Sequence, residues 1–219
     1  MRLSPSTLNL FLECPKCFWL QFRADIHRPQ GPFSSLPSGM DSLIKKYFDQ
    51  YRLLGQLPPE LAGKVDNAQL FPDLESLNQW RSWRTGLVYQ DQASGAALSG
   101  AIDELLVKDG QYIPTDYKTR GYDVKEGGEN FYQNQLNCYA LLLRENNLPD
   151  AGYAWLVYWI PKEISEGGIV KFMIDLKKVK TNTEEALRVL RSAANLLAGP
   201  MPSSHSQCAF CSWGAALTD

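Results

Sequence analysis

Two pairs of cysteines near opposite ends of the chain constrain its fold more than any other feature of the sequence. Cys14 and Cys17 form one Cys-x-x-Cys pair, and Cys208 and Cys211 form the other. Each pair places two thiolates close enough together to bind one metal ion. Because the two pairs together supply four ligands, we predict that the N- and C-terminal segments meet at a shared metal site.

Other readings of these cysteines remain open. A redox role is possible for either pair alone, but no thioredoxin-like βαβ pattern surrounds them. The pairs can also be unrelated, reduced thiols. Zinc and iron–sulfur clusters both use four thiolates, and the spacing does not separate them. The fifth cysteine, Cys138, is interpreted as a small buried residue.

The composition is that of a globular protein. The chain has 219 residues, of which 44% are hydrophobic and 21% are charged, and this length suits one domain. The net charge of -2 argues against a protein that coats nucleic acid, but it leaves room for an enzyme with a local basic groove. With no visible signal peptide or long apolar run, we expect a cytoplasmic protein without a membrane partner.

Hydrophobic periodicity predicts helices on both sides of a strand-rich middle. A first helix is expected after a cap at Ser4 or Ser6, and a last helix after a cap at Thr181 or Thr183. Further helices are expected over residues 39–55, 73–83 and 127–147, and a loop over 27–39. Strands are expected over residues 85–92, 96–110, 111–119, 151–161 and 168–176.

This order of elements predicts an α/β fold (an α+β mixed sheet) in which a central mixed β-sheet is flanked by helices. We expect a single domain over residues 1–219. Its expected parts are an N-terminal helical part over 1–85, a core over 86–180, and a C-terminal helix and cysteine segment over 181–219.

Two acids and a lysine lie on neighbouring predicted strands. Asp103 precedes and Asp116 follows the dipeptide Asp109-Gly110, which is a strong signal for a hairpin turn. Neighbouring strands lie about 4.8 Å apart, so the two carboxylates could share one hard cation. Lys118 is two residues beyond Asp116, and strand alternation therefore puts both on the same face.

Cleavage of a phosphodiester bond needs a set of this kind. Mg²⁺ and Mn²⁺ prefer carboxylate oxygens and water, polarise the phosphoryl group and lower the pKa of a bound water. A lysine beside the ion can orient or deprotonate that water, or stabilise the charge that develops. The carbonyl of Tyr117 is a further candidate ligand. The alternative is a solvated strand face on which Asp-x-Lys occurs by chance.

With Gln135 and Tyr139 on the following helix, these segments resemble the PD-(D/E)xK nuclease superfamily, and within it the RecB-like branch. That branch has a GxxD strand, a (D/E)xK strand and a QxxxY helix in this order. The resemblance implies a restriction-endonuclease-like core, with Asp103 and Asp116 as metal ligands and Lys118 as the catalytic lysine. It also implies that Gln135 and Tyr139, which share one helix face, contact DNA or order the site. A core aromatic is the alternative for Tyr139.

One departure from the branch concerns a histidine. RecB-like nucleases usually carry a histidine on an early helix as an extra metal ligand. The corresponding segment here, GMDSLIKKYFD, has none, and His27 and His205 lie elsewhere. Asp41 is our candidate replacement, with Asp49 as a second possibility and a first-turn helix acid as the alternative.

The start of the chain carries a second resemblance. Residues 6–15 resemble the SxxxxFxxCP start of CRISPR-associated RecB-like exonucleases and of the AddB nuclease domain. Several of these proteins hold a [4Fe–4S] cluster, so the resemblance implies such a cluster on the four cysteines. Those families have one N-terminal and three C-terminal cysteines, whereas this chain has two and two. Zinc therefore stays the alternative.

Candidate nucleic-acid contacts come from two segments and four basic residues. Aromatic and basic side chains alternate over residues 18–23 and 80–84, a pattern that can stack bases and hold phosphates, although such aromatics are more often core. The candidates for a local basic groove are Lys45, Lys46, Arg52 and Arg120.

We therefore expect a Mg²⁺- or Mn²⁺-dependent deoxyribonuclease, by resemblance an exonuclease, that acts on single-stranded DNA or DNA ends. Other nucleic-acid-processing proteins are the expected partners, and both CRISPR adaptation and recombination repair are compatible with the resemblance. The first alternative is a catalytically inactive DNA-binding or accessory module that keeps the fold and the cysteine site. A zinc-stabilised interaction protein is a third hypothesis. The sequence does not predict the oligomeric state.

Overall fold

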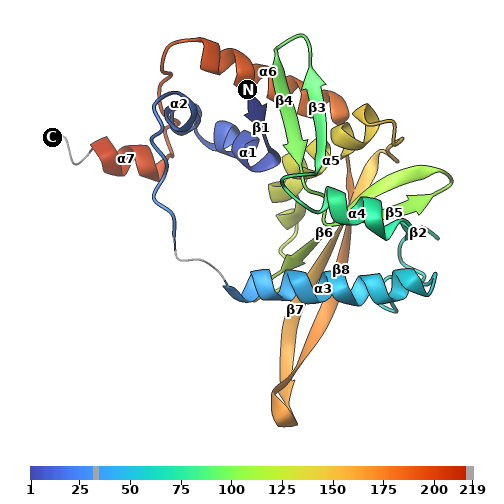
Figure 1. The fold of residues 1–219 in the computed structure, drawn as a ribbon. Helices are drawn as coiled ribbons and strands as arrows, with labels where there is room; N and C mark the ends of the chain where they lie inside the picture. Colours follow the sequence, from blue (N-terminus) through green and yellow to red (C-terminus); the bar gives the residue numbers. More distant parts are fainter. Residues whose placement is uncertain (32–34, 216–219) are drawn as a thin grey trace.

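Two β-sheets form the centre of the computed structural model, which describes residues 1–31 and 35–215 (Figure 1). The smaller sheet has the order β1-β4-β3, and the larger has the order β2-β5-β6-β7-β8. In the larger sheet β6 and β7 are parallel, whereas the other pairs are antiparallel. The strands are β1 (Arg2–Leu3), β2 (Gln69–Leu70), β3 (Leu87–Asp91), β4 (Ala96–Gly100), β5 (Glu104–Lys108), β6 (Gln111–Thr119), β7 (Tyr153–Ser165) and β8 (Ile169–Lys180).

Helices flank these sheets, so the predicted α/β fold with a mixed sheet is confirmed. The α-helices are α1 (Pro5–Glu13), α2 (Pro15–Arg23), α3 (Ser35–Leu53), α4 (Leu74–Trp80), α5 (Gln133–Glu145), α6 (Thr183–Ala198) and α7 (Ala209–Ala215). Two short 3₁₀ helices are η1 (Gly128–Tyr132) and η2 (Glu166–Gly168). None of the helices within the described ranges combines the length and apolarity that a bilayer crossing requires.

Polar side chains cap the N-termini of the first helix, α1, and of helix α6. Ser4, one of the two expected caps, accepts a hydrogen bond from the backbone of Thr7, and the Thr7 hydroxyl accepts one from the backbone of Ser4. The caps expected for α6, Thr181 or Thr183, are wrong. Asn182 caps that helix by accepting from the backbone of Glu185 at 3.0 Å, since asparagine is at least as good a cap as threonine.

The loop expected over residues 27–39 is shorter than predicted. Helix α3 begins at Ser35, although part of the predicted loop, residues 32–34, lies outside the described residues. Pro37 falls in the first turn of α3, where a proline is tolerated because the backbone N–H has no partner in the helix.

The single strand expected over residues 96–110 is instead two strands in two different sheets. Strand β4 ends at Gly100, and β5 begins at Glu104. Asp103 therefore lies on the link between the sheets and not on a strand. Gly100 allows the close packing at this point, because a Cβ there would lie 2.8 Å from a methyl carbon of Leu142.

The hairpin expected at Asp109-Gly110 is confirmed. Lys108 pairs with Gln111 across a two-residue turn. Asp109 and Gly110 have φ angles of 50° and 76°, as a type I′ turn requires. This turn sets the register of β5 and β6, the two strands next to the site described below.

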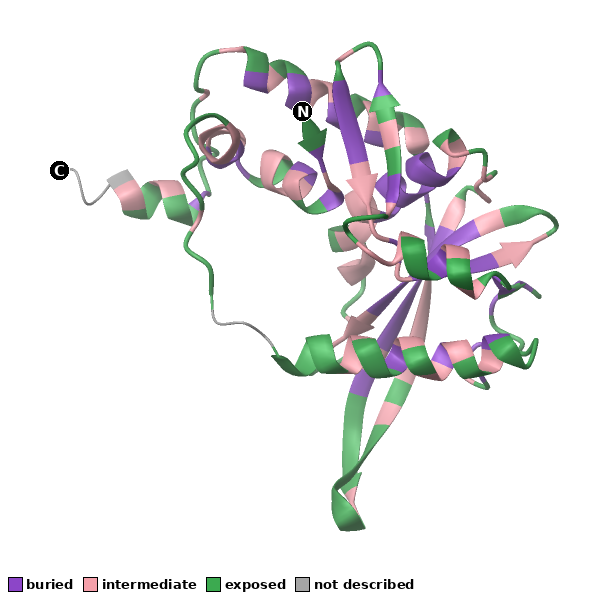
Figure 2. Ribbon diagram, in the orientation of Figure 1, coloured by how far each residue is buried: buried purple, intermediate pink, exposed green. Residues whose placement is uncertain are grey.

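The two faces of the larger sheet are covered by different helices. Helix α5 contacts strands of both sheets and is buried at every position from Leu136 to Leu143 (Figure 2). Helix α3 covers the opposite face, where the ring of Phe48 lies 4.8 Å from that of Tyr117. Strand alternation then turns Asp116 toward α5, one residue before Tyr117 turns toward α3.

Candidate nuclease site

The candidate site lies where β5 leaves the larger sheet. Strand β5 pairs with β6 only as far as Glu104 opposite Thr115. Residues 116–119 of β6 continue beyond this point and pair with β7 alone. The link that carries Asp103 therefore departs beside Asp116, so an acid from each segment reaches the same place.

Asp116 is fully buried and only partly satisfied by hydrogen bonds. Its Oδ1 accepts a hydrogen bond from Nε2 of Gln135 at 3.0 Å. Its Oδ2 pairs with the ammonium of Lys118, but accepts no well-aligned hydrogen bond from any residue that the structure describes. Burial raises the pKa of Asp116 to about 7; Lys118 opposes this rise, and the neighbouring carboxylate of Asp103 adds to it.

Gln135 connects the acid to the aromatic residue one helical turn away. The Nε2 of Gln135 also donates to the hydroxyl of Tyr139 at 2.7 Å, and its Oε1 accepts from Lys118 at 3.4 Å. The ammonium of Lys118 lies 4.6 Å from the ring centroid of Tyr132. The structure thus brings together four residues that the sequence singled out: Asp116, Lys118, Gln135 and Tyr139.

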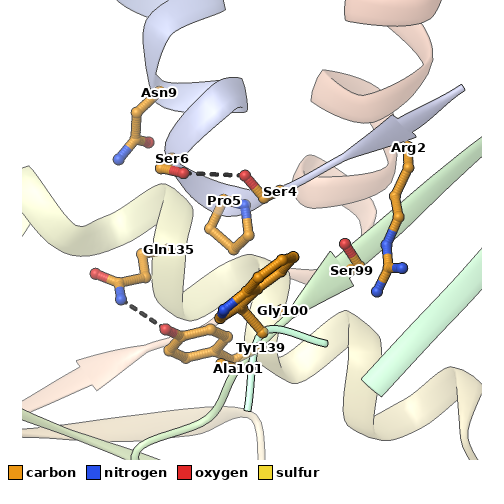
Figure 3. Close-up of a pocket in the computed structure, with 11 residues that line it drawn as sticks. Arg2, Ser4, Pro5, Ser6, Asn9, Ser99, Gly100, Ala101, Gln135 and Tyr139 are labelled. Atoms are coloured by element: carbon orange, nitrogen blue, oxygen red, sulfur yellow. Dashed lines mark hydrogen bonds between the residues drawn. The ribbon is translucent and has the colours of Figure 1, made fainter. Parts of the chain in front are cut away.

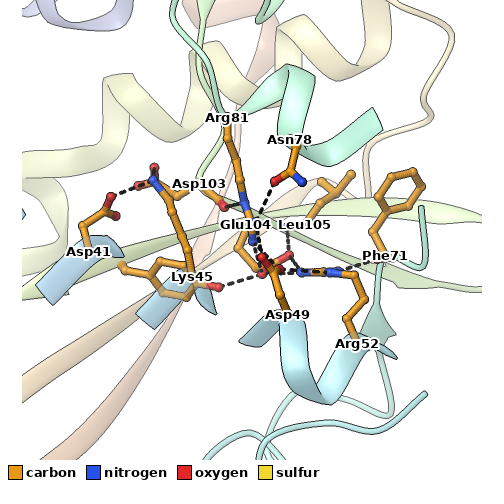
Figure 4. Close-up of polar contacts among 11 residues, drawn as sticks. Asp41, Lys45, Asp49, Arg52, Phe71, Asn78, Arg81, Asp103, Glu104 and Leu105 are labelled. Atoms are coloured by element: carbon orange, nitrogen blue, oxygen red, sulfur yellow. Dashed lines mark hydrogen bonds and ion pairs between the residues drawn. The ribbon is translucent and has the colours of Figure 1, made fainter. Parts of the chain in front are cut away.

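Helix α3, on the face of the larger sheet opposite α5, contributes a lysine and an acid (Figure 4). The Nζ of Lys45 lies 2.8 Å from an oxygen of Asp41 and 2.8 Å from an oxygen of Asp103. Burial lowers the pKa of Lys45, but these two carboxylates outweigh it and hold the pKa above its ordinary value. Asp41, the candidate replacement for the missing histidine, therefore reaches Asp103 through Lys45.

The backbone of the link is held by residues at the end of α4. Arg81 donates from Nε to the carbonyl of Asp103 at 2.9 Å, and its guanidinium pairs with Asp49 at 2.8 and 3.0 Å. The backbone N–H of Ile102 donates to the carbonyl of Trp80 at 3.0 Å. These contacts fix the position of Asp103 although it is not on a strand.

A buried ion network behind the site was missed by sequence reasoning. Glu104 is fully buried, and Nη2 of Arg52 lies 2.6 Å from each of its carboxylate oxygens. Arg81 lies 3.1 Å from the same carboxylate (Figure 4). Arg52 is therefore not part of a basic groove, as the sequence suggested, because its side chain is 1% exposed. The available signal was an acid, Glu104, directly before the apolar run Leu105–Leu106–Val107.

Tyr117 belongs to this network through its side chain. Its hydroxyl donates to Glu104 at 2.7 Å, and burial together with this carboxylate raises the pKa of Tyr117 well above its usual range. The ring lies on the α3 face, away from Asp116. The suggested role of the Tyr117 carbonyl as a metal ligand stays a prediction.

The aromatic segments mostly pack in the interior. Phe18 is fully buried, and the indole N–H of Trp19 donates to the carbonyl of Gly199 at 3.1 Å. Trp80 stacks on Phe71 with ring centroids 5.3 Å apart. For these residues the core alternative was right, and the exposed aromatic of the two segments is described below.

The two cysteine pairs meet, as the sequence predicted. The four thiol sulfurs lie within 4.8 Å of one another. The Sγ of Cys17 is 3.6 Å from that of Cys208 and 3.5 Å from that of Cys211. Cys138 lies elsewhere, and burial raises the pKa of its thiol to about 12. A set of four converging thiolates can hold a metal.

Comparison with known proteins agrees with this arrangement. Residues 41–216 match the family model described as the PD-(D/E)XK nuclease superfamily. This chain belongs to that superfamily. Among solved structures it is similar to an alkaline exonuclease (LHK-Exo) from Laribacter hongkongensis, at 6% identity over 90% of this chain and 86% of that chain, with a TM-score of 0.40. A likeness this distant carries no argument about function. No curated protein sequence matches the chain.

PD-(D/E)XK nucleases typically use divalent metal ions, and the residues present fit one. Asp103 and Asp116 offer carboxylate oxygens, the ligands that Mg²⁺ and Mn²⁺ prefer. The buried Oδ2 of Asp116 lacks a well-aligned hydrogen bond and lies beside a second carboxylate. Two like charges in one site are stabilised by a shared cation, and the chemistry of this pair therefore suits a divalent ion.

Proposed function

We propose that this chain is a Mg²⁺- or Mn²⁺-dependent deoxyribonuclease that acts on single-stranded DNA or DNA ends, as an exonuclease. One observation carries the proposal. The buried carboxylate of Asp116 contacts Lys118 and Gln135, and its pKa responds to the charge of Asp103. Three residues, from a link, a strand and a helix, thus converge on the carboxylate of Asp116 in a chain of a nuclease superfamily.

Each residue has a distinct role in this proposal. When bound by Asp103 and Asp116, the divalent ion supplies polarisation of the phosphoryl group and a lowered pKa for the attacking water. The ammonium of Lys118 orients that water by hydrogen bonding and offsets negative charge that develops on the phosphoryl oxygens. Gln135 is a positioning residue, because its bond to Oδ1 of Asp116 fixes the orientation of the carboxylate whose Oδ2 lies beside Lys118. Tyr139 is also a positioning residue, because its hydroxyl accepts a hydrogen bond from Gln135 and so holds the amide in place.

The test is cleavage of end-labelled single-stranded DNA in Mn²⁺ by the wild type and by two variants. Asp116→Asn removes a ligand charge, and Lys118→Met removes the ammonium while keeping the length of the side chain. We expect each to lower the rate at least about 100-fold, the scale of losing one charged catalytic group. Asp175→Asn and Lys177→Met are matched controls, since these two residues form an ion pair on β8 and should keep the wild-type rate. Equal activity in all five proteins would overturn the assignment.

A catalytically inactive DNA-binding or accessory module is the second candidate. The observation that favours it is Lys45, whose ammonium pairs with Asp103, a carboxylate that a metal would need. This module would bind DNA and cleave none in Mg²⁺, Mn²⁺, Ca²⁺ or Co²⁺. DNA binding without cleavage in every metal selects this candidate over the first.

The RecB-like branch is our proposed place within the superfamily. The order of the GxxD segment, the hairpin strand and the QxxxY helix supports it, as does the resemblance of residues 6–15 to CRISPR-associated RecB-like exonucleases and the AddB nuclease domain. A role in CRISPR adaptation or recombination repair, with other nucleic-acid-processing proteins as partners, is proposed on that resemblance alone.

The four cysteines are proposed to hold a structural metal that joins the two ends of the chain. The resemblance of the N-terminus supports a [4Fe–4S] cluster. The sulfur spacing supports the zinc alternative, because a tetrahedral zinc with bonds of about 2.3 Å separates its sulfurs by about 3.8 Å. Three of the six sulfur separations are 3.5, 3.6 and 3.8 Å, and all six are within 4.8 Å. The visible spectrum of protein purified without oxygen distinguishes the two: brown for the cluster, colourless with one zinc per chain for the alternative.

A further inference from the structure

A pocket of about 540 Å³ opens beside the candidate nuclease site (Figure 3). It lies between the start of α1, the end of β4 and helix α5. Gln135 and Tyr139 form part of its wall. Because Gln135 donates to both Tyr139 and Asp116, this wall is one hydrogen bond away from the proposed metal-binding carboxylate.

The chemistry of the lining suits an anion with an aromatic ring. The lining contains one arginine, serine hydroxyls, two amides and two aromatic rings, but no carboxylate. This is notable in a chain whose net charge is -2. Arg2 is exposed, and it makes no hydrogen bond to the other residues drawn in Figure 3. Its guanidinium is therefore available for an outside anion, for which arginine is well suited.

Trp83 supplies an exposed aromatic face to the same pocket. It is 75% exposed, whereas its neighbour in sequence Trp80 packs against Phe71. The guanidinium of Arg84 lies 5.0 Å from the Trp83 ring, which adds positive charge near it. An exposed indole beside an arginine is the combination that proteins use to stack a base and hold its phosphate.

We propose that this pocket holds one unstacked nucleotide of a single-stranded nucleic acid, next to the nucleotide whose phosphate is cleaved. Trp83 stacks on the base, and Arg2 pairs with the phosphate. The volume is within the usual range of about 300–1,000 Å³ for pockets that bind small molecules. This inference rests on the proposed nuclease function, and it deepens that function by naming the pocket and the two residues that hold an unstacked nucleotide of the substrate.

A duplex does not fit this arrangement. Bases within a duplex are stacked on their neighbours, so none offers a free face to Trp83. The pocket therefore selects single strands or frayed ends before any chemistry occurs. The two amides of the lining already have partners, since Gln135 donates to Asp116 and Tyr139 and Asn9 accepts from Asn134. We therefore expect little preference among sequences.

The test measures binding of a fluorescein-labelled dT oligonucleotide by anisotropy in EDTA, so that cleavage plays no part. We expect Trp83→Ala to weaken binding about 5- to 100-fold, the range for loss of one stacked base, and Trp83→Phe to restore most of it. Trp213→Ala is the matched control, because Trp213 is 64% exposed on α7 and is not among the residues that line the pocket. Duplex DNA of the same length should bind equally to the wild type and Trp83→Ala.

The arginine is tested by the dependence of binding on salt. Arg2→Gln should reduce the slope of log affinity against log salt by about one phosphate contact, whereas Arg188→Gln on the exposed face of α6 should not. Wild-type-like binding by Trp83→Ala, equal loss in Trp213→Ala, or no single-strand binding by the wild type would each overturn the inference. If the Trp83 and Arg2 variants change binding as expected but the wild type cleaves no DNA in any metal, the proposed nuclease activity is overturned instead.

Discussion

The ammonium of Lys45 lies 2.8 Å from a carboxylate oxygen of Asp103. Lys45 lies on α3, the helix on which the resemblance to RecB-like nucleases led us to expect a histidine. A neutral histidine adds a ligand to a metal, whereas an ammonium competes with the metal for the same carboxylate. The effect is electrostatic, since two cations a few ångströms apart in a partly buried site repel each other.

Replacing this lysine by a neutral residue should therefore tighten metal binding. We expect Lys45→Gln to lower the dissociation constant for Mn²⁺ about 5- to 30-fold, which corresponds to ~1–2 kcal/mol of relieved repulsion. Isothermal titration with MnCl₂ gives the constant directly. Lys46→Gln, an exposed neighbour on the same helix, is the control and should bind Mn²⁺ as the wild type does. Weaker binding in Lys45→Gln would show that the lysine supports the ion and does not compete with it.

The buried pair of Arg52 and Glu104 should make a large contribution to folding. Their side chains are 1% and 0% exposed. Arg52→Met therefore leaves the buried carboxylate of Glu104 with only Arg81 and Tyr117 as side-chain partners. We expect the free energy of unfolding to fall by about 3–5 kcal/mol, as for other broken buried pairs. Urea denaturation followed by circular dichroism measures it. The exposed Arg188→Met should keep the wild-type midpoint, and an equal shift in both variants would contradict the expectation.

We expect a side chain at Gly100 to destabilise the fold. A Cβ at this position would lie 2.8 Å from a methyl carbon of Leu142 and 3.5 Å from the ring of Tyr139, so Gly100→Ala must shift the side chain of Leu142. We expect a loss of about 1–3 kcal/mol in unfolding free energy, together with reduced DNA cleavage. Gly31→Ala is the control, since none of the described residues lies within 4 Å of a Cβ placed at Gly31. Thermal melts and the cleavage assay check both effects, and unaltered stability in Gly100→Ala would refute this expectation.

Removing one ligand should empty the four-cysteine site. Cys208→Ser should lose the metal proposed for this site and lower the melting temperature, because that metal would join the two ends of the chain through the four sulfurs. Metal content per chain, measured by elemental analysis, is the readout. Cys138→Ser should keep the full metal content, because Cys138 is buried on α5 and outside the cluster. Full metal occupancy in Cys208→Ser would exclude this residue as a ligand.

Features that depend on a few neighbouring residues were predictable from the sequence. The turn at Asp109-Gly110, the cap at Ser4 and the shared face of Gln135 and Tyr139 are of this kind. Each follows from backbone preference or helical spacing within a short segment. The meeting of the two distant cysteine pairs also followed, because each Cys-x-x-Cys pair has metal-ligand spacing and two such pairs complete a four-ligand set.

Only the tertiary structure decided what surrounds the acids. Strand periodicity placed Asp103 on a long strand, but packing against α5 at Gly100 breaks that strand and puts the acid on a link. Arg52 and Lys45 both seemed suited to a surface groove. Arg52 is instead buried against Glu104, and Lys45 pairs with Asp103. The partner of a charged side chain depends on which element packs across from it, and that information is not contained in the residues next to it in sequence.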